Sequence, residues 1–266
     1  MKVFISVDLE GVSGYVKWDE ADRLRERELI TGDVNAAIEG VCLGGASEVL
    51  VTEAHGNMRN LIPEKVDSRA RFLSGSPKIL NHMAGIDGSF DAALLIGYHS
   101  RAGTLNGVMS HTYAGSIFKL AFNSLEVGEI GADAAIAGAY GVPVVMVSGD
   151  EAACKEAQAL LGDIETVSVK EGIGRFAAKC LPVDQARKRI KEAATKIAER
   201  ADSVRPFVIE PPVRTEITFT DPSCADAASR LPFAKRIDGR TVSFESKTYL
   251  EAFKLFDAIH FLASVV

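Results

Sequence analysis

The sequence predicts an α/β protein in which helices flank a mainly parallel sheet and a smaller α+β domain follows at the C-terminus. In the N-terminal part, short β-branched runs alternate with longer helical stretches, which is typical of a parallel sheet covered by helices. Further on, three prolines stand within residues 206–212. Such a density favours an extended linker over a helix or a central strand. We therefore predict a large α/β domain over residues 1–205 and a small α+β domain over residues 206–266.

Hydrophobic periodicity predicts most elements of the large domain. Apolar, β-branched runs predict buried central strands at Val3–Val7, Glu48–Thr52, Ala93–Gly97 and Val142–Val147. The charged, periodic segment Glu20–Leu43 predicts a long amphipathic helix, and Asp133–Tyr140 predicts a shorter, alanine-rich one. Between them, Ser116–Val127 is interpreted as an antiparallel excursion.

Two further helices have recognisable starts. Asp150 stands where an N-cap is expected, in front of a helix over Glu151–Leu161. A strand at Glu165–Val169 would extend the sheet. The segment Pro182–Ala201 predicts a helix, because proline is tolerated in a first turn and an apolar stripe runs beneath the charges.

The small domain is predicted to alternate strands and helices. They are the strand Thr215–Thr220, the helix Cys224–Leu231, the short strand Arg236–Ile237, the strand Thr241–Ser246 and the helix Thr248–Leu262. Because this segment contains no dense polar cluster, we expect it to cap, recognise or oligomerise rather than to catalyse.

Composition narrows the class of protein. The formal net charge of −6 leaves no basic excess to neutralise a phosphate backbone or an anionic membrane. Asp8 interrupts the first apolar run too early for a signal peptide, and no segment has the roughly 20 apolar residues of a membrane span. The cysteines lie far apart without a CxxC pair, which argues against a cysteine zinc site. We expect a cytoplasmic protein that binds neither nucleic acid nor membrane.

Metal-binding residue types follow the predicted strands. Asp8 and Glu10 leave the first strand, His55 follows the second and His99 follows the third. Parallel sheets bind ligands beyond the carboxyl ends of their strands, so these side chains are expected at one edge. Two carboxylates two residues apart lie on one side of an extended segment. Their mutual repulsion favours a cation between them.

Mixed imidazole and carboxylate ligands suit zinc, with manganese or cobalt as alternatives. A further acidic ligand is expected, and Glu129 is the better candidate because Gly128 and Gly131 flank it and allow close approach of the backbone. Glu126 is the alternative. His82, in a short helical stretch, and His260, on the apolar face of the last helix, are interpreted as structural.

Five segments then identify a resemblance. They are SVDLEGVSG from Ser6, EAHGNMRNL from Glu53, GYHSRAG from Gly97, GVMSH from Gly107 and VGEIG from Val127. In order and spacing they resemble the zinc-dependent D-aminopeptidases of the DppA type. The resemblance implies a two-zinc centre in which Asp8 bridges the ions and the other ligands are Glu10, His55, His99 and Glu129. It also implies His111 as the catalytic histidine and a ring of ten subunits.

The expected reaction is hydrolysis of short peptides that begin with a D-amino acid, by water that two metal ions activate. His111 would stabilise the oxyanion or pass a proton to the leaving amine, or else orient a ligand without taking part in proton transfer. Arg101 and Asn60 are the candidate substrate-binding residues. Another two-metal hydrolase, an amidase or a phosphoesterase, is one alternative, and a non-catalytic, metal-stabilised peptide-binding protein is another.

Overall fold

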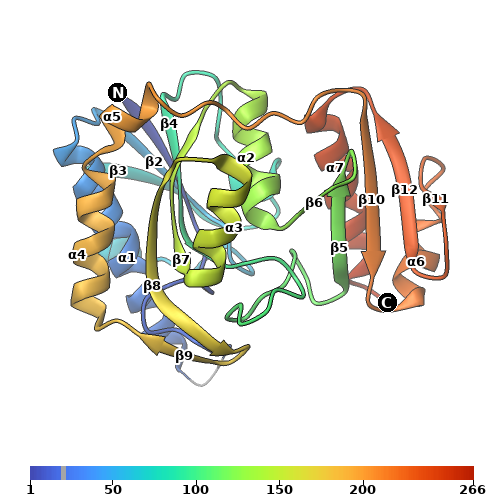
Figure 1. Ribbon diagram of the computed structural model, residues 1–266, viewed down its shortest axis with the longest axis horizontal. Helices are drawn as coiled ribbons and strands as arrows, with labels where there is room; N and C mark the ends of the chain where they lie inside the picture. Colours follow the sequence, from blue (N-terminus) through green and yellow to red (C-terminus); the bar gives the residue numbers. More distant parts are fainter. Residues whose placement is uncertain (19–21) are drawn as a thin grey trace.

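The computed structural model describes residues 1–18 and 22–266 and arranges them as two sheets with surrounding helices (Figure 1). The larger, seven-stranded sheet has the order β3-β2-β1-β4-β7-β8-β9. Its strands are β1 (Lys2–Val7), β2 (Glu48–Glu53), β3 (Ala70–Leu73), β4 (Ala92–Tyr98), β7 (Val144–Asp150), β8 (Glu165–Gly174) and β9 (Ala177–Cys180). Neighbouring strands are parallel except for the pair β8 and β9. The predicted fold class is confirmed.

The smaller sheet is antiparallel and stands at the right of Figure 1, with the order β11-β12-β10-β5-β6. Its strands are β5 (Ile117–Phe122), β6 (Leu125–Val127), β10 (Val213–Phe219), β11 (Lys235–Arg236) and β12 (Thr241–Ser246). The expected antiparallel excursion is β5 and β6, and β5 pairs with β10. The C-terminal segment therefore completes its sheet with strands from the middle of the chain, on the N-terminal side of residue 206.

Helices cover both faces of the larger sheet. They are α1 (Arg23–Leu43), α2 (Glu129–Ala139), α3 (Glu151–Leu161), α4 (Val183–Ala194) and α5 (Ile197–Ala201). The helices α6 (Pro222–Ala228) and α7 (Tyr249–Ala263) pack instead against β10 and β12 of the smaller sheet, and α7 also contacts α2. Two short 3-10 turns are η2 (Pro63–Lys65) and η3 (Asn81–Met83). Side chains of β1 alternate between the faces, as the period of a strand requires. Val3 and Ile5 pack with α1 and α4, whereas Phe4 belongs to the core shared with α2 and α7. Among the described residues, none of the helices has the length and apolar composition needed to cross a membrane.

The differences from the predicted elements have local causes. The strands β3 (ARFL) and β9 (AAKC) were not predicted, because they are half-exposed edge strands without an apolar run. The helix expected over Pro182–Ala201 is divided between α4 and α5. The start of α1 expected at Glu20 lies outside the described residues. Asp150 caps α3 as predicted, since its carboxylate accepts the backbone N–H of Ala153 at 2.8 Å.

Candidate metal centre

The strand order creates a point at which ligands can bind. From β1 the chain passes through α1 to β2 on one side, whereas β4 lies on the other side of β1. Open α/β sheets bind ligands beyond the carboxyl ends of the strands at such a change of direction. Asp8 leaves β1 at this point, His55 lies just beyond β2, and His99 follows β4 directly.

Close backbone contact fixes the two central residues relative to each other. The N–H of Asp8 donates to Ile96 O at 2.8 Å, and the N–H of Gly11 donates to Gly97 O at 2.7 Å. Gly97 has a φ of +72°, and a Cβ atom there would lie 2.3 Å from the carbonyl oxygen of Asp8. Only glycine permits this approach. The end of β4, and with it His99, is therefore held against the Asp8 loop.

The five expected ligands converge. His55 Nδ1 lies 2.8 Å from Glu10 Oε2 and 3.6 Å from Asp8 Oδ1. His99 Nε2 lies 3.5 Å from Asp8 Oδ2 and 3.4 Å from Glu129 Oε1. Glu129 is the first residue of α2, where the helix dipole favours a negative charge.

Two buried polar atoms in this group have no hydrogen-bond partner among the described residues. They are Asp8 Oδ2 and His99 Nε2, although Asp8 is 2% exposed and His99 is 1% exposed. The other ring nitrogen of His99, Nδ1, faces the carbonyl oxygen of Ser100 at 2.9 Å, so Nδ1 carries a proton and Nε2 is the nitrogen that offers a lone pair to a metal ion once the ring is neutral. A buried polar atom without a partner is costly. The donor set therefore fits a transition-metal ion.

The charges perturb one another strongly. Burial raises the pKa of Asp8 from 3.8 to about 6, and the neighbouring charge of Glu10 adds to this. Burial also acts to raise the pKa of Glu10, but the charge of His55 outweighs it and holds that pKa well below the usual value. For His99, burial acts to lower the pKa, and the carboxylate of Glu129 raises it well above the usual value. Likewise, burial acts to lower the pKa of His55, but the charge of Glu10 outweighs it and raises that pKa well above the usual value. Without metal, His55 and His99 therefore hold protons at neutral pH.

We therefore predict that zinc uptake releases protons and strengthens as pH rises. Asp8 can act as a ligand only when ionised, so protonation around pH 6 removes it, and protons on His55 and His99 compete with the metal. Calorimetric titration of zinc into chelator-stripped protein, in buffers of different ionisation enthalpy, will measure the release. Affinity independent of pH between about 5.5 and 7.5 would contradict the assignment.

His111 lies beside this group. Its ring stacks on that of His99 with centroids 4.1 Å apart, and its Nε2 lies 3.6 Å from Glu129 Oε1. Its Nδ1 bonds to the carbonyl oxygen of Met109 at 2.9 Å, which leaves Nε2 for a proton or a ligand. Burial and the charge of His99 lower the pKa of His111. A neutral imidazole at neutral pH suits a group that accepts and returns a proton.

A buried lysine supports the loop that carries Glu10. Lys170 of β8 is 2% exposed, and its Nζ donates to the carbonyl oxygens of Glu10 at 2.6 Å, Val12 at 2.9 Å and Tyr15. Burial lowers the pKa of Lys170 to about 8. Trp18 adds a second restraint, because its indole N–H donates to Glu10 Oε1 at 2.5 Å.

Behind Glu129, a hydrogen-bond network centres on Asp133 of α2. Its carboxylate accepts from the hydroxyls of Tyr98 at 2.7 Å and Tyr113 at 2.9 Å, and it lies 3.1 Å from His82 Nδ1. Burial acts to lower the pKa of His82, but the charge of Asp133 raises it to about 9. The sequence signal for this network is an aspartate that interrupts an otherwise apolar, alanine-rich helix.

A cavity of about 210 Å³ adjoins the candidate ligands. Its walls include Asp8, His55, His111 and Glu129, together with Asn81, His82, His260 and Phe261. The second set was not singled out as functional in the sequence, where His82 and His260 were interpreted as structural. Nothing in their local sequence indicates that η3 and α7 meet at this cavity.

The structure does not bring the two expected substrate-binding residues to this cavity. The guanidinium of Arg101 donates to Glu126 Oε1 at 2.6 Å, and Arg101 lines a different cavity beside α3. The amide of Asn60 donates to the carbonyl oxygen of His55 at 2.8 Å, and its backbone N–H donates to Glu53. Asn60 thus holds the loop of His55 in place. Glu126, the alternative metal ligand, forms an ion pair with Arg101 instead.

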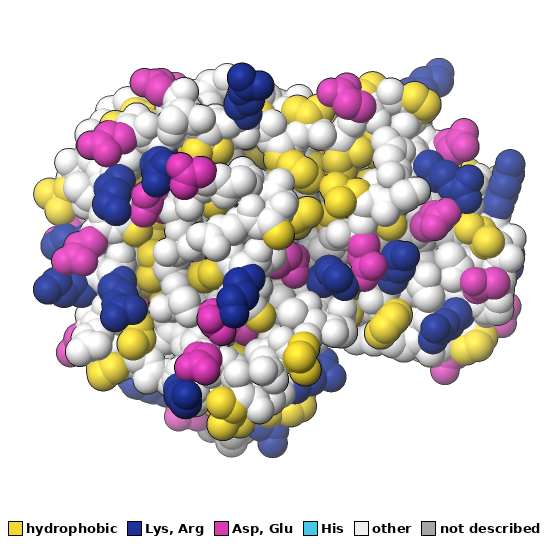
Figure 2. All heavy atoms as spheres, in the orientation of Figure 1, with side chains coloured by type: hydrophobic (Ala, Val, Ile, Leu, Met, Phe, Trp, Pro, Cys, Tyr) yellow, Lys and Arg dark blue, Asp and Glu magenta, His cyan; other side chains and the backbone are white. Residues whose placement is uncertain are grey.

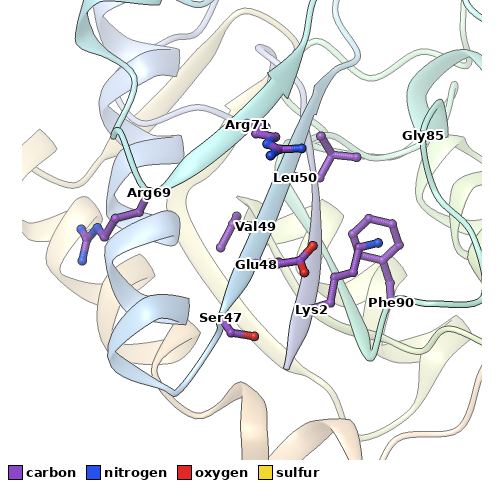
Figure 3. A pocket seen from close by; sticks show the side chains of 9 residues that line it. All are labelled: Lys2, Ser47, Glu48, Val49, Leu50, Arg69, Arg71, Gly85 and Phe90. Atoms are coloured by element: carbon purple, nitrogen blue, oxygen red, sulfur yellow. The ribbon is translucent and has the colours of Figure 1, made fainter.

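Larger cavities lie away from this chemistry. One of about 560 Å³ opens among the first residues of β1 and β2, with Lys2, Glu48 and Arg71 on its walls (Figure 3). It lies at the amino ends of the parallel strands, the edge at which such sheets do not usually bind ligands. On the face drawn in Figure 2, acidic and basic side chains are interspersed, without a continuous basic patch.

Comparison with known proteins decides the family. A family model described as D-aminopeptidase matches residues 1–258. The chain belongs to the D-aminopeptidase family. A D-aminopeptidase of Bacillus subtilis (strain 168) is 37% identical over 262 residues, which cover 96% of this chain and 94% of that protein. A solved structure, the Zn-dependent D-aminopeptidase DppA from Bacillus subtilis, described as a self-compartmentalizing protease, matches with a TM-score of 0.97. It is 35% identical and the match covers 100% of this chain and 99% of that one.

The D-aminopeptidase family match confirms the resemblance drawn from the five sequence segments. It also confirms the predicted class of enzyme, a metal-dependent D-aminopeptidase. A phosphoesterase and a non-catalytic binding protein are correspondingly disfavoured.

Proposed function

We propose that Asp8, Glu10, His55, His99 and Glu129 of this D-aminopeptidase would hold two zinc ions, and that the enzyme removes D-amino acids from the N-terminus of short peptides. The observation that carries the proposal is the pair of buried, unpartnered atoms Asp8 Oδ2 and His99 Nε2, 3.5 Å apart. The zinc dependence of the DppA structure supports the choice of metal. Manganese or cobalt would suit the same ligand types.

Bound zinc supplies a Lewis acid for the substrate carbonyl and lowers the pKa of water toward ~7. The protein's own residues do the rest. His111 lines the cavity, and its Nε2, 3.6 Å from Glu129 Oε1, accepts a proton as water attacks and passes it to the leaving amine. Asp8, Glu10 and Glu129 supply negative charge that holds the metal, and the network at Asp133 and Lys170 keeps these ligands in position.

Replacing His111 by alanine separates a catalytic role from a supporting one. If His111 transfers the proton, kcat falls by about 10²- to 10⁴-fold while zinc content stays unchanged. If it only orients a ligand or binds metal itself, zinc content falls and turnover of the metal-replete variant survives within a few-fold. Metal analysis and steady-state kinetics on the same preparation distinguish these outcomes.

The small cavity favours a short substrate. About 210 Å³ is below the ~300–1,000 Å³ typical of pockets for larger ligands, so a small N-terminal residue such as D-alanine fits best. Incubation with D-Ala-D-Ala, L-Ala-L-Ala, a D-aminoacyl amide and a phosphodiester tests this. We expect hydrolysis of the D-peptide, lost on chelation and restored by zinc. Turnover of the phosphodiester alone, or binding without any product, would overturn the proposal.

The assembly and location remain part of the proposal. The DppA structure is that of a self-compartmentalizing protease, which supports a closed homo-oligomer, and we propose a ring of ten subunits in the cytoplasm. Residues 206–266, with β5 and β6, would contribute to subunit contacts or to capping of the site. Sedimentation that gives a stable 28.5 kDa monomer at micromolar concentration would refute the ring.

A further inference from the structure

One wall of the cavity carries polar atoms that the metal ligands do not explain. Asn81 of η3 is 4% exposed and lines the cavity. Its amide Nδ2 donates to Asp257 Oδ1 at 2.7 Å, whereas its Oδ1 is buried without a hydrogen-bond partner among the described residues. Nearby, His260 Nδ1 is likewise buried without a hydrogen-bond partner in the described part of the chain, and it lies 3.9 Å from Asp257 Oδ1. Asn81 and His260 thus both line the cavity, and each has one buried polar atom to which no described residue hydrogen-bonds.

The orientation of the Asn81 amide follows from its partner. An ionised Asp257 can only accept hydrogen bonds, so the amide nitrogen must face it and the amide oxygen must face the other way. The contact with a carboxylate also polarises the amide and makes Oδ1 a stronger acceptor. The amide oxygen of Asn81, a residue that lines the cavity, is therefore an acceptor of defined orientation that no described residue satisfies.

The backbone at this point is held in an unfavourable conformation. Leu80 has a φ of +65° and Asn81 a φ of +48°, and two consecutive non-glycine residues in this region are uncommon. Such conformations cost on the order of 1–3 kcal/mol each and persist only where the surroundings impose them. The contact between Asn81 and α7 provides such a restraint.

The chemistry of the wall indicates its ligand. A buried acceptor without a partner costs about 1–3 kcal/mol, so the matching ligand must be a hydrogen-bond donor. The substrate of an aminopeptidase carries an α-ammonium group with three N–H donors, one carbon away from the carbonyl that is attacked. Of the groups on a small peptide, only this one brings several donors and a positive charge to the side of the metal centre.

We infer that Asn81 Oδ1 binds the free α-ammonium group of the substrate, with His260 Nδ1 as a second acceptor and Asp257 as the residue that orients Asn81. This inference rests on the proposed function, since it assigns the substrate's amino end within the same cavity. On this inference, residues of η3 and α7, and not the metal ligands, select substrates with a free N-terminus.

The test compares substrates with and without the amino group. Asn81→Gly removes the amide, and glycine accepts the positive φ, so the backbone is not strained further. We expect kcat/KM for D-alanyl-p-nitroanilide to fall about 10- to 100-fold, while kcat/KM for propionyl-p-nitroanilide, which lacks the amine, changes less than about threefold. D-Alanine hydroxamate and propionohydroxamate also differ by the amino group. The ratio of their inhibition constants measures the contribution of that group to binding.

The controls separate this inference from folding and from the proposed function. Asn123→Gly makes the same change at a φ of +50° in the exposed turn between β5 and β6 and should leave both substrates unaffected. If Asn81→Gly does not fold, Asp257→Asn is the second variant. It should lower the ratio of kcat/KM for D-alanyl-p-nitroanilide to kcat/KM for propionyl-p-nitroanilide about three- to tenfold. An equal loss of kcat/KM on both substrates, or an unchanged ratio of the two kcat/KM values, overturns the assignment. Asn81 Oδ1 would then accept from a water molecule instead of the substrate. If the wild type cleaves no D-aminoacyl substrate, it is the proposed function that fails.

Discussion

Substitution of Asp8 by asparagine will abolish metal binding at the centre and lower kcat/KM by about 10³-fold or more. The change keeps the size of the side chain but removes the charge that Asp8 would share between two ions. Metal ions in such sites provide several kcal/mol of transition-state stabilisation, and each 1.36 kcal/mol corresponds to a tenfold change in rate. Metal analysis and kinetics of the purified variant measure both effects.

The same substitution will stabilise the metal-free protein. Burial and the charge of Glu10 raise the pKa of Asp8 from 3.8 to about 6. For an acid with a raised pKa in the folded state, stability is present below pH 3.8 and is lost as pH rises through about 6. At 1.36 kcal/mol for each pH unit, this lowers the free energy of unfolding by about 3 kcal/mol at pH 7. Asparagine does not ionise and therefore avoids part of this loss. Urea unfolding in the presence of chelator, at pH 7 and pH 5, will show this gain shrink with falling pH.

Asp163→Asn is the matched control, because the Asp163 side chain is 90% exposed and pairs only at the surface with Arg200. It should change neither metal content nor activity. Should Asp8→Asn retain activity within tenfold together with an unchanged metal content, Asp8 is not a ligand and the proposed centre is wrong.

Replacing Lys170 by methionine will destabilise the protein by about 3 kcal/mol. The ammonium is the partner of three buried carbonyl oxygens in the loop after β1, and each loses its donor at a cost of about 1–3 kcal/mol. Relief from burying a charge offsets part of this. Because Glu10 lies in the same loop, zinc affinity should also fall about 10- to 100-fold, as expected when support of a ligand is removed.

Urea unfolding and zinc titration measure these two effects. Lys188→Met on α4 serves as the control, since its Nζ lies 3.8 Å from Glu192 and its side chain is 75% exposed. We expect a change within about 0.5 kcal/mol there. If Lys170→Met unfolds at the wild-type urea concentration, the loop does not depend on this lysine.

The sequence was sufficient for the central part of the fold. The strands β1, β2, β4 and β7 are continuous apolar runs, and such runs are what a buried parallel sheet requires. The edge strands β3 and β9 are too polar to stand out. Pairing of β5 with β10 depends on residues far apart in the chain, Thr215 opposite Phe122 for example, which local periodicity does not encode.

The candidate ligands were predictable for a reason that does not extend to the rest of the site. Asp8, His55 and His99 each follow a strand of one parallel sheet, so their proximity follows from topology alone. Asn81, His82 and His260 reach the cavity from a 3-10 turn and from the last helix, whose docking depends on tertiary packing. Arg101 was predicted to bind substrate only because it stands two residues after His99. Its side chain instead pairs with Glu126, so closeness in sequence was misleading here.

The most direct test of the central claim is metal analysis of the protein purified without added metal or chelator, with the content expressed per 28.5 kDa chain. The account predicts about two zinc ions per chain, removable by chelation together with activity and restored by zinc. A chain that contains no transition metal and takes up none on dialysis against zinc would contradict it.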